Sequence, residues 1–318
     1  MTCRLTTDPE EAAAVIRAGG LVALPTETVY GLGADATNST AVARIFAAKQ
    51  RPAFDPLIVH LASFEQWPTV ATDLPPRARR LAERFWPGPL TLILPRQPRI
   101  SELVTSGLPT VAVRVPRHPL MHAVLEQAGC PIAAPSANCF GRLSPTRAEH
   151  VRDQLGDVID LILDGGSCDV GVESTIVRPD AEAATILRVG GLPVEDVAAV
   201  AGPVRLATAD IPTAPEAPGM LPQHYAPRTP IELVTTAPAP PTGARWGLLT
   251  LAPTARDGYA ATEALSETGD LVRAAARFFA ALHRLDALGL DRIIAVEFPE
   301  TGLGRAINDR LRRAAATP

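Results

Sequence analysis

Hydroxyl, carboxylate and glycine residues are concentrated in the stretch 24–35, Leu-Pro-Thr-Glu-Thr-Val-Tyr-Gly-Leu-Gly-Ala-Asp. The apolar run 21–24 leads into it and is typical of a short buried strand. Gly31 and Gly33 allow a tight turn or a close approach of the backbone to a ligand. Polar groups at the exit of a strand suit a small-molecule site. A polar loop that caps the next helix would have the same composition.

One lysine stands out, because Lys49 is the only lysine among the 30 basic residues. A lone ammonium in a chain that otherwise uses arginine suggests a position that requires a compact point charge. Arg51 follows two positions later, before a proline. Together the two cations can clamp a phosphate chain. The alternative is a surface lysine at a solvated helix end.

Two arginines lie within apolar strands, Arg114 in the run 111–115 and Arg188 in the run 185–189. A guanidinium buried in such a strand pays a large desolvation cost unless it is paired. The partner is either a buried acid or an anionic ligand, and the sequence leaves both open. His60 ends another apolar strand, where a histidine is either a site residue or a satisfied core group.

Further hydroxyl and amide groups follow predicted strands. Ser136 and Asn138 come after the buried run 132–134, and the segment 171–175 adds a carboxylate and two hydroxyls. Ser144 precedes a helix, where it also suits an N-cap region. Four such clusters, with four cations, are more than helix capping requires, so we expect a polar ligand site in this part of the chain.

No common catalytic or metal-binding motif is present. The sequence contains no Walker A motif, no G-x-G-x-x-G after a strand, no H-E-x-x-H and no G-x-S-x-G. Its four cysteines form no C-x-x-C pair, which argues against a zinc site and gives no disulfide framework.

Strands and helices alternate in the first two thirds of the chain, which predicts an α/β domain whose later strands can pair antiparallel. The expected strands are 21–24, 56–60, 90–94, 111–115, 132–134, 159–163, 173–177 and 185–189. The expected helices begin near Asp8 and continue with 40–48, 77–85, 119–127 and 146–154.

Proline recurs without periodicity after residue 202, which is typical of a semi-rigid linker. A second, smaller α/β unit follows, with strands at 246–251 and 292–297 and helices at 271–288 and 303–315. We therefore expect a catalytic domain at 1–202, a linker at 203–230 and a C-terminal domain at 231–318.

The composition limits the classes of function. The 318 residues are 47% hydrophobic and 20% charged, as in soluble globular proteins, and no apolar run approaches the ~20 residues of a membrane span. A net charge of −4 and an aromatic content of 4% argue against a dedicated nucleic-acid binder. We expect a cytoplasmic protein, because no apolar signal region is present.

Taken together, these stretches resemble the threonylcarbamoyl-AMP synthases, the YrdC-like family, in the long bacterial form with a C-terminal extension. The matching segments, in order, are 25–33, 49–52, 56–60, 85–94, 111–116, 135–138, 144–146, 164–166, 173–177, 218–227 and 298–315. The resemblance implies a twisted mixed α/β sheet around a large basic cavity, a linker that closes over it and a Rossmann-like C-terminal domain.

The resemblance also implies an activity. The family is a group of nucleotidyltransferases that make L-threonylcarbamoyladenylate from L-threonine, bicarbonate or CO2, and ATP, with release of pyrophosphate. The product serves threonylcarbamoylation of the tRNA adenosine next to the anticodon, through a downstream transferase machinery. Mg²⁺ is expected with ATP. No enzyme nucleophile is required, which agrees with the absence of a triad or reactive-cysteine motif.

The implied site residues fall into two groups. Those on the threonine side are Thr28, His60, Arg114, Ala134 and Ser174. Those on the ATP side are Lys49, Arg51, Asp55, Thr110, Ser136, Asn138, Ser144, Arg188 and Tyr225, with Lys49 and Arg51 as the catalytic pair. Pairing with the threonine carboxylate would account for the burial of Arg114.

The chain departs from the family pattern at three places. Asp55 replaces the more usual Asn, where a carboxylate either repels the triphosphate or serves as the candidate metal ligand. Val189 replaces a more usual proline, and the pair Cys139-Phe140 alters the loop after Asn138. Two other functions stay open: an RNA-binding module, because YrdC-like domains have been linked to RNA, and a carbamoyl-transfer domain with another acceptor.

Overall fold

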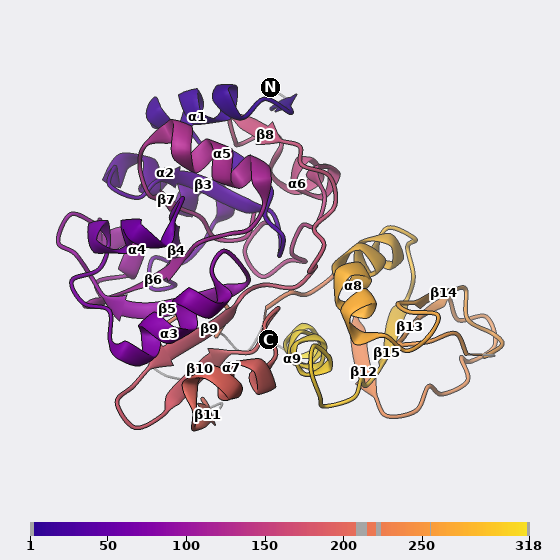
Figure 1. Ribbon diagram of the computed structural model, residues 1–318. Coiled ribbons are helices and arrows are strands. Elements are labelled where there is room, and N and C mark those ends of the chain that lie inside the picture. The colour runs from indigo at the N-terminus through magenta and orange to yellow at the C-terminus, as the bar shows by residue number, and fades with distance from the viewer. Residues whose placement is uncertain (1–2, 208–214, 221–223, 255, 317–318) are drawn as a thin grey trace.

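The computed structural model describes residues 3–207, 215–220, 224–254 and 256–316. Its strands form two sheets, one of 11 strands with mixed directions and one of four parallel strands (Figure 1). The smaller sheet belongs to a C-terminal domain, whose two helices lie on the side that faces the larger domain (Figure 1). No helix in the described residues is long and apolar enough to cross a membrane.

The large sheet combines parallel and antiparallel pairs. Its order is β1 (Arg4–Thr6), β8 (Leu161–Leu163), β2 (Val22–Leu24), β3 (Gly31–Asp35), β7 (Ile132–Ala133), β4 (Ile58–His60), β6 (Thr110–Arg114), β5 (Leu90–Pro95), β9 (Thr175–Pro179), β10 (Ala184–Arg188) and β11 (Val204–Leu206). The pair β9/β10 is antiparallel, which confirms that the later strands do not all run in one direction.

Helices cover this sheet. They are α1 (Pro9–Arg17), α2 (Ser39–Lys49), the 3-10 helix η1 (Phe64–Thr69), α3 (Pro76–Phe85), α4 (Glu102–Thr105), α5 (Pro119–Ala128), α6 (Ala148–Leu155) and α7 (Val194–Ala201). The sequence predicted α1, α2, α3, α5 and α6. The short elements η1 and α4 and the helix α7 were not predicted.

The ends of α2 show how the local sequence positions a site residue. Asn38 is the N-cap residue, and its side chain accepts a hydrogen bond from the Ala41 amide. At the other end Gln50 adopts a left-handed conformation with φ of 52°. The helix therefore stops directly after Lys49, and the chain turns so that Arg51 is also buried.

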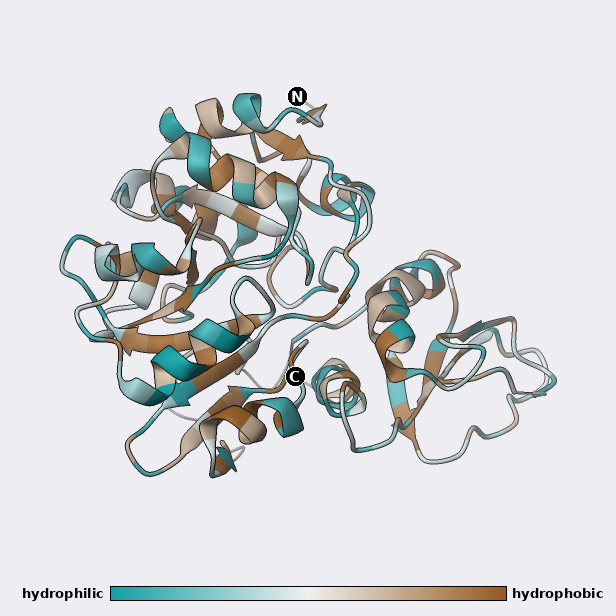
Figure 2. Cartoon of the chain, viewed as in Figure 1, coloured by the Kyte–Doolittle hydropathy of each residue, from teal (hydrophilic) through white to brown (hydrophobic). Residues whose placement is uncertain are grey.

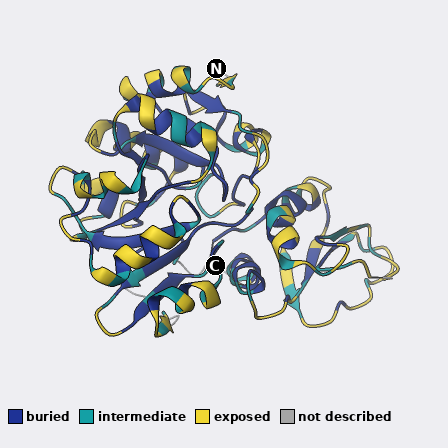
Figure 3. Cartoon of the chain, viewed as in Figure 1, coloured by how far each residue is buried: buried dark blue, intermediate teal, exposed yellow. Residues whose placement is uncertain are grey.

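Apolar residues on the strands make the main core. Val59, Leu92 and Val113 of β4, β5 and β6 are fully buried in a cluster that also contains residues of α2 and α3. Figures 2 and 3 show the same pattern, since the strands of the large sheet are hydrophobic and buried while the outer helix faces are polar and exposed.

The C-terminal domain holds β12 (Ile231–Val234), β15 (Arg292–Val296), β13 (Trp246–Thr250) and β14 (Ala261–Ala264), in that order across the sheet. Its helices are α8 (Leu271–Asp286) and α9 (Gly304–Ala315). The two predicted strands and both predicted helices are present within two residues of the expected limits. The short strands β12 and β14 were not predicted.

The stretch 24–35 differs from the expected loop, because its second half forms β3 antiparallel to β2. A Cβ atom at Gly33 would lie 2.6 Å from the end of the Leu24 side chain, so a larger residue here would displace that side chain. Only the segment 25–30 forms the polar tip of the hairpin.

The expected linker at 203–230 contains a strand at its start. Val204–Leu206 form β11, which pairs in parallel with β10. Residues 208–214 and 221–223 of the linker lie outside the described residues. The domain boundaries at 202 and 230 stay a prediction.

Candidate active site

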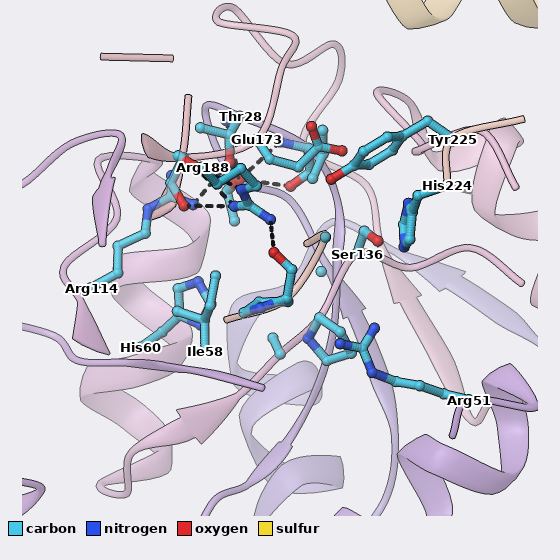
Figure 4. A pocket seen from close by; sticks show the side chains of 18 residues that line it. Thr28, Arg51, Ile58, His60, Arg114, Ser136, Glu173, Arg188, His224 and Tyr225 are labelled. Carbon is cyan, nitrogen blue, oxygen red and sulfur yellow. Dashed lines mark hydrogen bonds between the residues drawn. The ribbon is translucent and has the colours of Figure 1, made fainter. Parts of the chain in front are cut away.

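A cavity lies where the 25–30 tip meets the ends of β4, β6 and β10 and the linker (Figure 4). Its free volume is about 40 Å³, and described residues of the linker form part of its wall. The described lining residues are Thr26, Thr28, Val29, Gly31, Arg51, Ile58, His60, Arg114, Ala134, Pro135, Ser136, Glu173, Ser174, Arg188, Pro218, Gly219, His224 and Tyr225.

Arg114 and His60 lie at one end of this cavity (Figure 4). They end two parallel strands and face each other in register across β6 and β4. Burial and the charge of Arg114 lower the pKa of His60 to about 3. His60 is therefore neutral at physiological pH and offers a hydrogen-bonding imidazole rather than a second charge.

The partner of Arg114 is a buried acid. Its guanidinium lies 2.8 Å from the Glu27 carboxylate, and it also donates to the Thr28 hydroxyl at 2.9 Å and to the Gly88 carbonyl at 3.1 Å. Burial alone would raise the pKa of Glu27, but the ion pair with Arg114 holds it below its usual value. Of the two partners that the sequence left open, a buried acid and an anionic ligand, the acid is present here and is enough to explain the burial of Arg114.

Arg51 lies at the opposite end, near His224 and Tyr225 (Figure 4). It pairs with Asp55 at 2.9 Å and donates to the carbonyls of Asp55 and Pro56. Burial raises the pKa of Asp55, although the charges of Arg51 and Lys49 oppose this. Asp55 thus anchors Arg51 from behind and does not itself line the cavity.

Lys49 is held beneath the loop that follows β7. Its ammonium group donates to the Ser136 carbonyl at 2.6 Å and to the Asn138 carbonyl. Burial and the neighbouring charge of Arg51 lower the pKa of Lys49 well below its usual value. In this arrangement Lys49 fixes the Ser136–Asn138 backbone and is not among the described residues that line the cavity.

Arg188 joins the wall of the cavity to the linker. It donates to the Ser174 carbonyl at 2.9 Å and to the Pro218 carbonyl at 3.0 Å. Ser174 also bonds through its hydroxyl to Thr91 at 2.7 Å. Arg188 therefore keeps β10, the Ser174 segment and the linker in one fixed arrangement.

The C-terminal domain contributes a buried cation next to this wall. Arg310 of α9 is fully buried and pairs with Glu173 at 2.8 Å. Burial alone would raise the pKa of Glu173, but Arg310, Arg188 and the Ser144 hydroxyl hold it below its usual value. The same guanidinium lies over the Tyr225 ring at 5.0 Å.

His224 and Tyr225 line the cavity on the same side as Arg51 (Figure 4). Their rings lie 4.1 Å apart, and Tyr225 has a left-handed φ of 64°. Burial and the surrounding arginine and lysine charges lower the pKa of His224 well below its usual value. The Tyr225 hydroxyl is buried and has no hydrogen-bond partner among the described residues, so it is available to a ligand.

Of the fourteen predicted site residues, nine line the cavity. They are Thr28, Arg51, His60, Arg114, Ala134, Ser136, Ser174, Arg188 and Tyr225. The other five, which are not among the described lining residues, are Lys49, Asp55, Thr110, Asn138 and Ser144.

Three of these five residues lie outside the cavity lining, as follows from their contacts. Asn138 donates to the Cys139 and Arg142 carbonyls, and Ser144 donates to Glu173, so both support the lining from behind. Thr110 begins β6 opposite Pro95 and is half-buried, away from the Arg114 end of the strand.

Sequence reasoning left out four charged or aromatic groups. Glu27 and Glu173 were included only as unnamed carboxylates and received no role, and His224 was covered only by the matching segment 218–227. Arg310 was missed, although the spacing of α9 contained a signal. It lies three positions after Ile307 and four before Ala314, on the same buried face of the helix.

The site offers no protein-only metal cluster, because the described residues contain no group of three His, Cys, Asp or Glu side chains placed to hold an ion. Asp55 does not fit the role of metal ligand well, since it is fully buried beside Arg51. The Ser174 hydroxyl has no histidine base among the described residues, because its hydrogen bonds are with Thr91 and Arg188. The arrangement can bind and orient anions, and neutralise their charge, without covalent catalysis.

Comparison with known families covers the two parts of the chain. Residues 14–190 match the Sua5/YciO/YrdC family model, described as "Telomere recombination". Residues 192–316 match the model described as "Threonylcarbamoyl-AMP synthase, C-terminal domain".

Similar proteins extend over nearly the full length. Threonylcarbamoyl-AMP synthases from Pyrococcus abyssi and Bacillus subtilis are 44% and 43% identical, over 96% and 98% of this chain and 93% and 94% of theirs. The crystal structure of P. abyssi Sua5 complexed with L-threonine has a TM-score of 0.91 at 39% identity, covering 99% of this chain and 98% of that one. With both family models matched in order and these relatives aligned end to end, the chain belongs to the threonylcarbamoyl-AMP synthase family, in its two-domain form.

Proposed function

We propose that the chain synthesises L-threonylcarbamoyladenylate from L-threonine, bicarbonate or CO2, and ATP, with release of pyrophosphate. The observation that carries this proposal is one cavity with two polar ends, with Arg114 and His60 at one and Arg51 at the other, while Arg188 lines the wall beside Ser174. An amino acid and a nucleotide triphosphate are substrates that require such separate anchors.

The Arg114 end suits threonine. Arg114 would hold the amino-acid carboxylate, while Glu27 and Thr28 fix the orientation of its guanidinium. Neutral His60 and the Ser174 hydroxyl can then hydrogen-bond the remaining polar groups. The solved complex of P. abyssi Sua5 with L-threonine supports this choice of substrate.

The Arg51 end suits the phosphates of ATP. Arg51 and Arg188 line the cavity and would neutralise phosphate oxygens, with Ser136 and Tyr225 as hydrogen-bonding groups beside them. Lys49 would act in two ways, by fixing the Ser136–Asn138 loop and by adding positive charge behind it.

The chemistry follows from this placement. The threonine amine takes up CO2 to form a carbamate, whose oxygen attacks the α-phosphorus of ATP, and the α–β bridging bond breaks as pyrophosphate leaves. The protein would contribute positioning and charge neutralisation. We propose that Mg²⁺ arrives as the Mg·ATP complex, held mainly by phosphate oxygens and water.

The product would supply threonylcarbamoylation of the tRNA adenosine next to the anticodon. A mixed carbamic–phosphoric anhydride is unstable in water, so a downstream transferase must take it up soon after release. The cytoplasmic location expected from the sequence stays a prediction.

The test is pyrophosphate release from ATP, with L-threonine and bicarbonate each omitted in turn. We expect release to require both, and to fall sharply when serine replaces threonine. Lys49→Ala should abolish release while circular dichroism still reports a folded chain. Pyrophosphate release that does not depend on threonine would contradict the proposed function. Near-normal turnover by Lys49→Ala would contradict the role of Lys49.

A further inference from the structure

Asp55 places a buried carboxylate directly behind the Arg51 end of the substrate cavity. The residue is fully buried, and neither of its carboxylate oxygens has a hydrogen-bond partner among the described residues. One of these oxygens lies 2.9 Å from the Arg51 guanidinium. Arg51 lines the cavity, whereas Asp55 is not among the described residues that do so. A buried acid without hydrogen bonds is costly, so its presence here requires an explanation.

Two backbone carbonyls already hold Arg51 in place. Its Nε atom donates to the main-chain carbonyl of Asp55 at 3.0 Å, and its guanidinium also donates to the Pro56 carbonyl at 2.9 Å. Both bonds are independent of the Asp55 side chain. The carboxylate therefore contributes mainly its negative charge, and not the position of the guanidinium.

That charge faces several cations. Burial raises the pKa of the Asp55 carboxyl group, but the charges of Arg51, Lys49 and Arg188 oppose this rise. All three cations are buried, and the charge of Arg51 adds to burial in lowering the pKa of Lys49. The cations thus repel one another in a poorly solvated place, and the Asp55 carboxylate offsets part of that repulsion.

We propose that Asp55 is an internal counter-charge that competes with phosphate groups for Arg51 and thereby helps pyrophosphate to leave. This inference rests on the proposed function, because it takes the Arg51 end as the phosphate end. Asp55 would not touch the phosphates and would act through the charge of Arg51. ATP has its adenosine part for further contacts, whereas pyrophosphate is held by its charges alone, so the carboxylate weakens the binding of pyrophosphate more than that of ATP.

Two other roles of Asp55 are less consistent with its surroundings. A metal ligand needs oxygens that reach an open site, but both oxygens are shielded and one lies beside a guanidinium. A purely structural ion pair would support Arg51, so its loss would leave the affinity for phosphate groups unchanged or weaker. Competition predicts the opposite sign, which makes the two roles separable by experiment.

The test is calorimetric titration of the full chain with pyrophosphate, in excess Mg²⁺ and at constant pH and ionic strength. Asp55→Asn removes the charge, nearly preserves the shape and keeps the carbonyls that hold Arg51. We expect it to bind pyrophosphate roughly tenfold more tightly than the wild type. Asp55→Ser, a second neutral variant, should also bind more tightly, and it keeps the test decisive if Asp55→Asn does not fold.

Asp169→Asn is the matched control. Asp169 also lies 2.9 Å from an arginine, Arg117, but both side chains are exposed. The variant loses the same charge away from the cavity, so its affinity for pyrophosphate should equal that of the wild type. In the activity assay, Asp55→Asn should lower the ATP KM and the inhibition constant of pyrophosphate without a change in the threonine KM. A displaced Arg51 would raise the ATP KM.

Arg51→Ala separates this inference from the proposed function, since it should abolish the binding of pyrophosphate. If Arg51→Ala loses binding but the neutral variants of Asp55 bind no more tightly than the wild type, the inference alone is overturned. If pyrophosphate binds Arg51→Ala as well as it binds the wild type, or binds neither, the assigned phosphate end is wrong and the inference is overturned with it.

Discussion

Arg310 of the C-terminal domain reaches the catalytic domain and forms a fully buried ion pair of 2.8 Å with Glu173. The same arginine also donates to the Val189 carbonyl at 2.8 Å and lies over the Tyr225 ring. One side chain from α9 therefore supports the sheet, the linker and a lining carboxylate of the substrate cavity.

Replacing Arg310 should strongly reduce both the stability and the activity of the protein. Arg310→Met keeps much of the side-chain volume but leaves Glu173 as an unpaired buried charge, so we expect the free energy of unfolding to fall by about 3–5 kcal/mol. Pyrophosphate release should fall as well, because Tyr225 loses its support. Denaturant unfolding and the activity assay measure both effects.

The control for this change is Arg312→Met. Arg312 lies on the same helix and pairs with Glu300 at the exposed surface, where an ion pair contributes about 1 kcal/mol or less. Equal losses for both variants would contradict the role of the buried pair. Adding Glu173→Gln to Arg310→Met should recover part of the lost stability.

Glu27→Gln tests the threonine end. The change leaves the Arg114 guanidinium without its buried counter-charge, so the unfolding free energy should fall by about 3–5 kcal/mol. L-threonine should then raise the melting temperature of this variant more than that of the wild type, because its carboxylate replaces the missing charge. Threoninol, which has no carboxylate, should not do so.

Glu126→Gln serves as the control, since Glu126 pairs with His122 at the exposed surface of α5. An equal or smaller threonine-induced shift in Glu27→Gln would show that Arg114 does not hold the ligand carboxylate. Arg114→Ala should raise the threonine KM far more than the ATP KM.

Gly219→Ala tests the packing of the linker. A Cβ atom at this position would lie 2.3 Å from the Tyr225 hydroxyl, so the ring must move. We expect pyrophosphate release to fall by roughly 100-fold, as is typical when a site group is displaced by about 1 Å.

Gly243→Ala is a matched control for backbone strain. Gly243 has a φ of 83°, close to the 79° of Gly219, but its added Cβ would meet open space. In both variants an alanine must adopt a positive φ, which costs about 1–2 kcal/mol. Similar activities in the two variants would show that the position of Tyr225 does not matter.

Two stacked histidines at the domain interface predict acid sensitivity. His150 of α6 and His283 of α8 lie with ring centroids 3.9 Å apart. Burial and then the charge of His283 lower the pKa of His150 to about 3, and burial lowers that of His283. Arg147 and Arg284 also face His150, while Asp286 and Asp153 act in the opposite sense on His283.

The lowered pKa of His150 sets the direction in which stability changes with pH. The unfolded chain takes up a proton at His150 near pH 6.5, whereas the folded chain does so only near pH 3. The free energy of unfolding should therefore decrease as the pH falls from about 6.5 towards 3. His150→Phe should make this decrease less steep, as measured by urea unfolding at several pH values. His122→Phe gives the background effect of losing a histidine, and an equal slope in both variants would contradict the prediction.

The sequence predicted the main strands and helices because their signals are local. Asp8 and Pro9 mark the start of α1, and apolar runs mark β5, β6 and β10. β3 was missed because Gly-Leu-Gly-Ala has little intrinsic strand preference, and only its pairing with β2 makes it a strand.

The sequence predicted which cations belong to the site, but not which groups pair with them. Arg114 and Arg188 were recognisable because charges within apolar runs need an explanation. Which group neutralises each of them depends on contacts between distant parts of the chain, as for Arg114 with Glu27. The sequence likewise could not show that the Lys49 ammonium group donates hydrogen bonds to backbone carbonyls instead of lining the cavity.

The ion pair between Glu173 and Arg310 also orders events during synthesis on the ribosome. Every described residue that lines the substrate cavity precedes Arg310 in the chain, so the strands and the linker emerge before the cation that neutralises Glu173. Until α9 docks, this carboxylate lacks its ion-pair partner, and only the Ser144 hydroxyl and the charge of Arg188 offset the cost of burying it. A nascent chain therefore reaches the fully neutralised cavity wall only after the α9 segment has left the ribosome and docked.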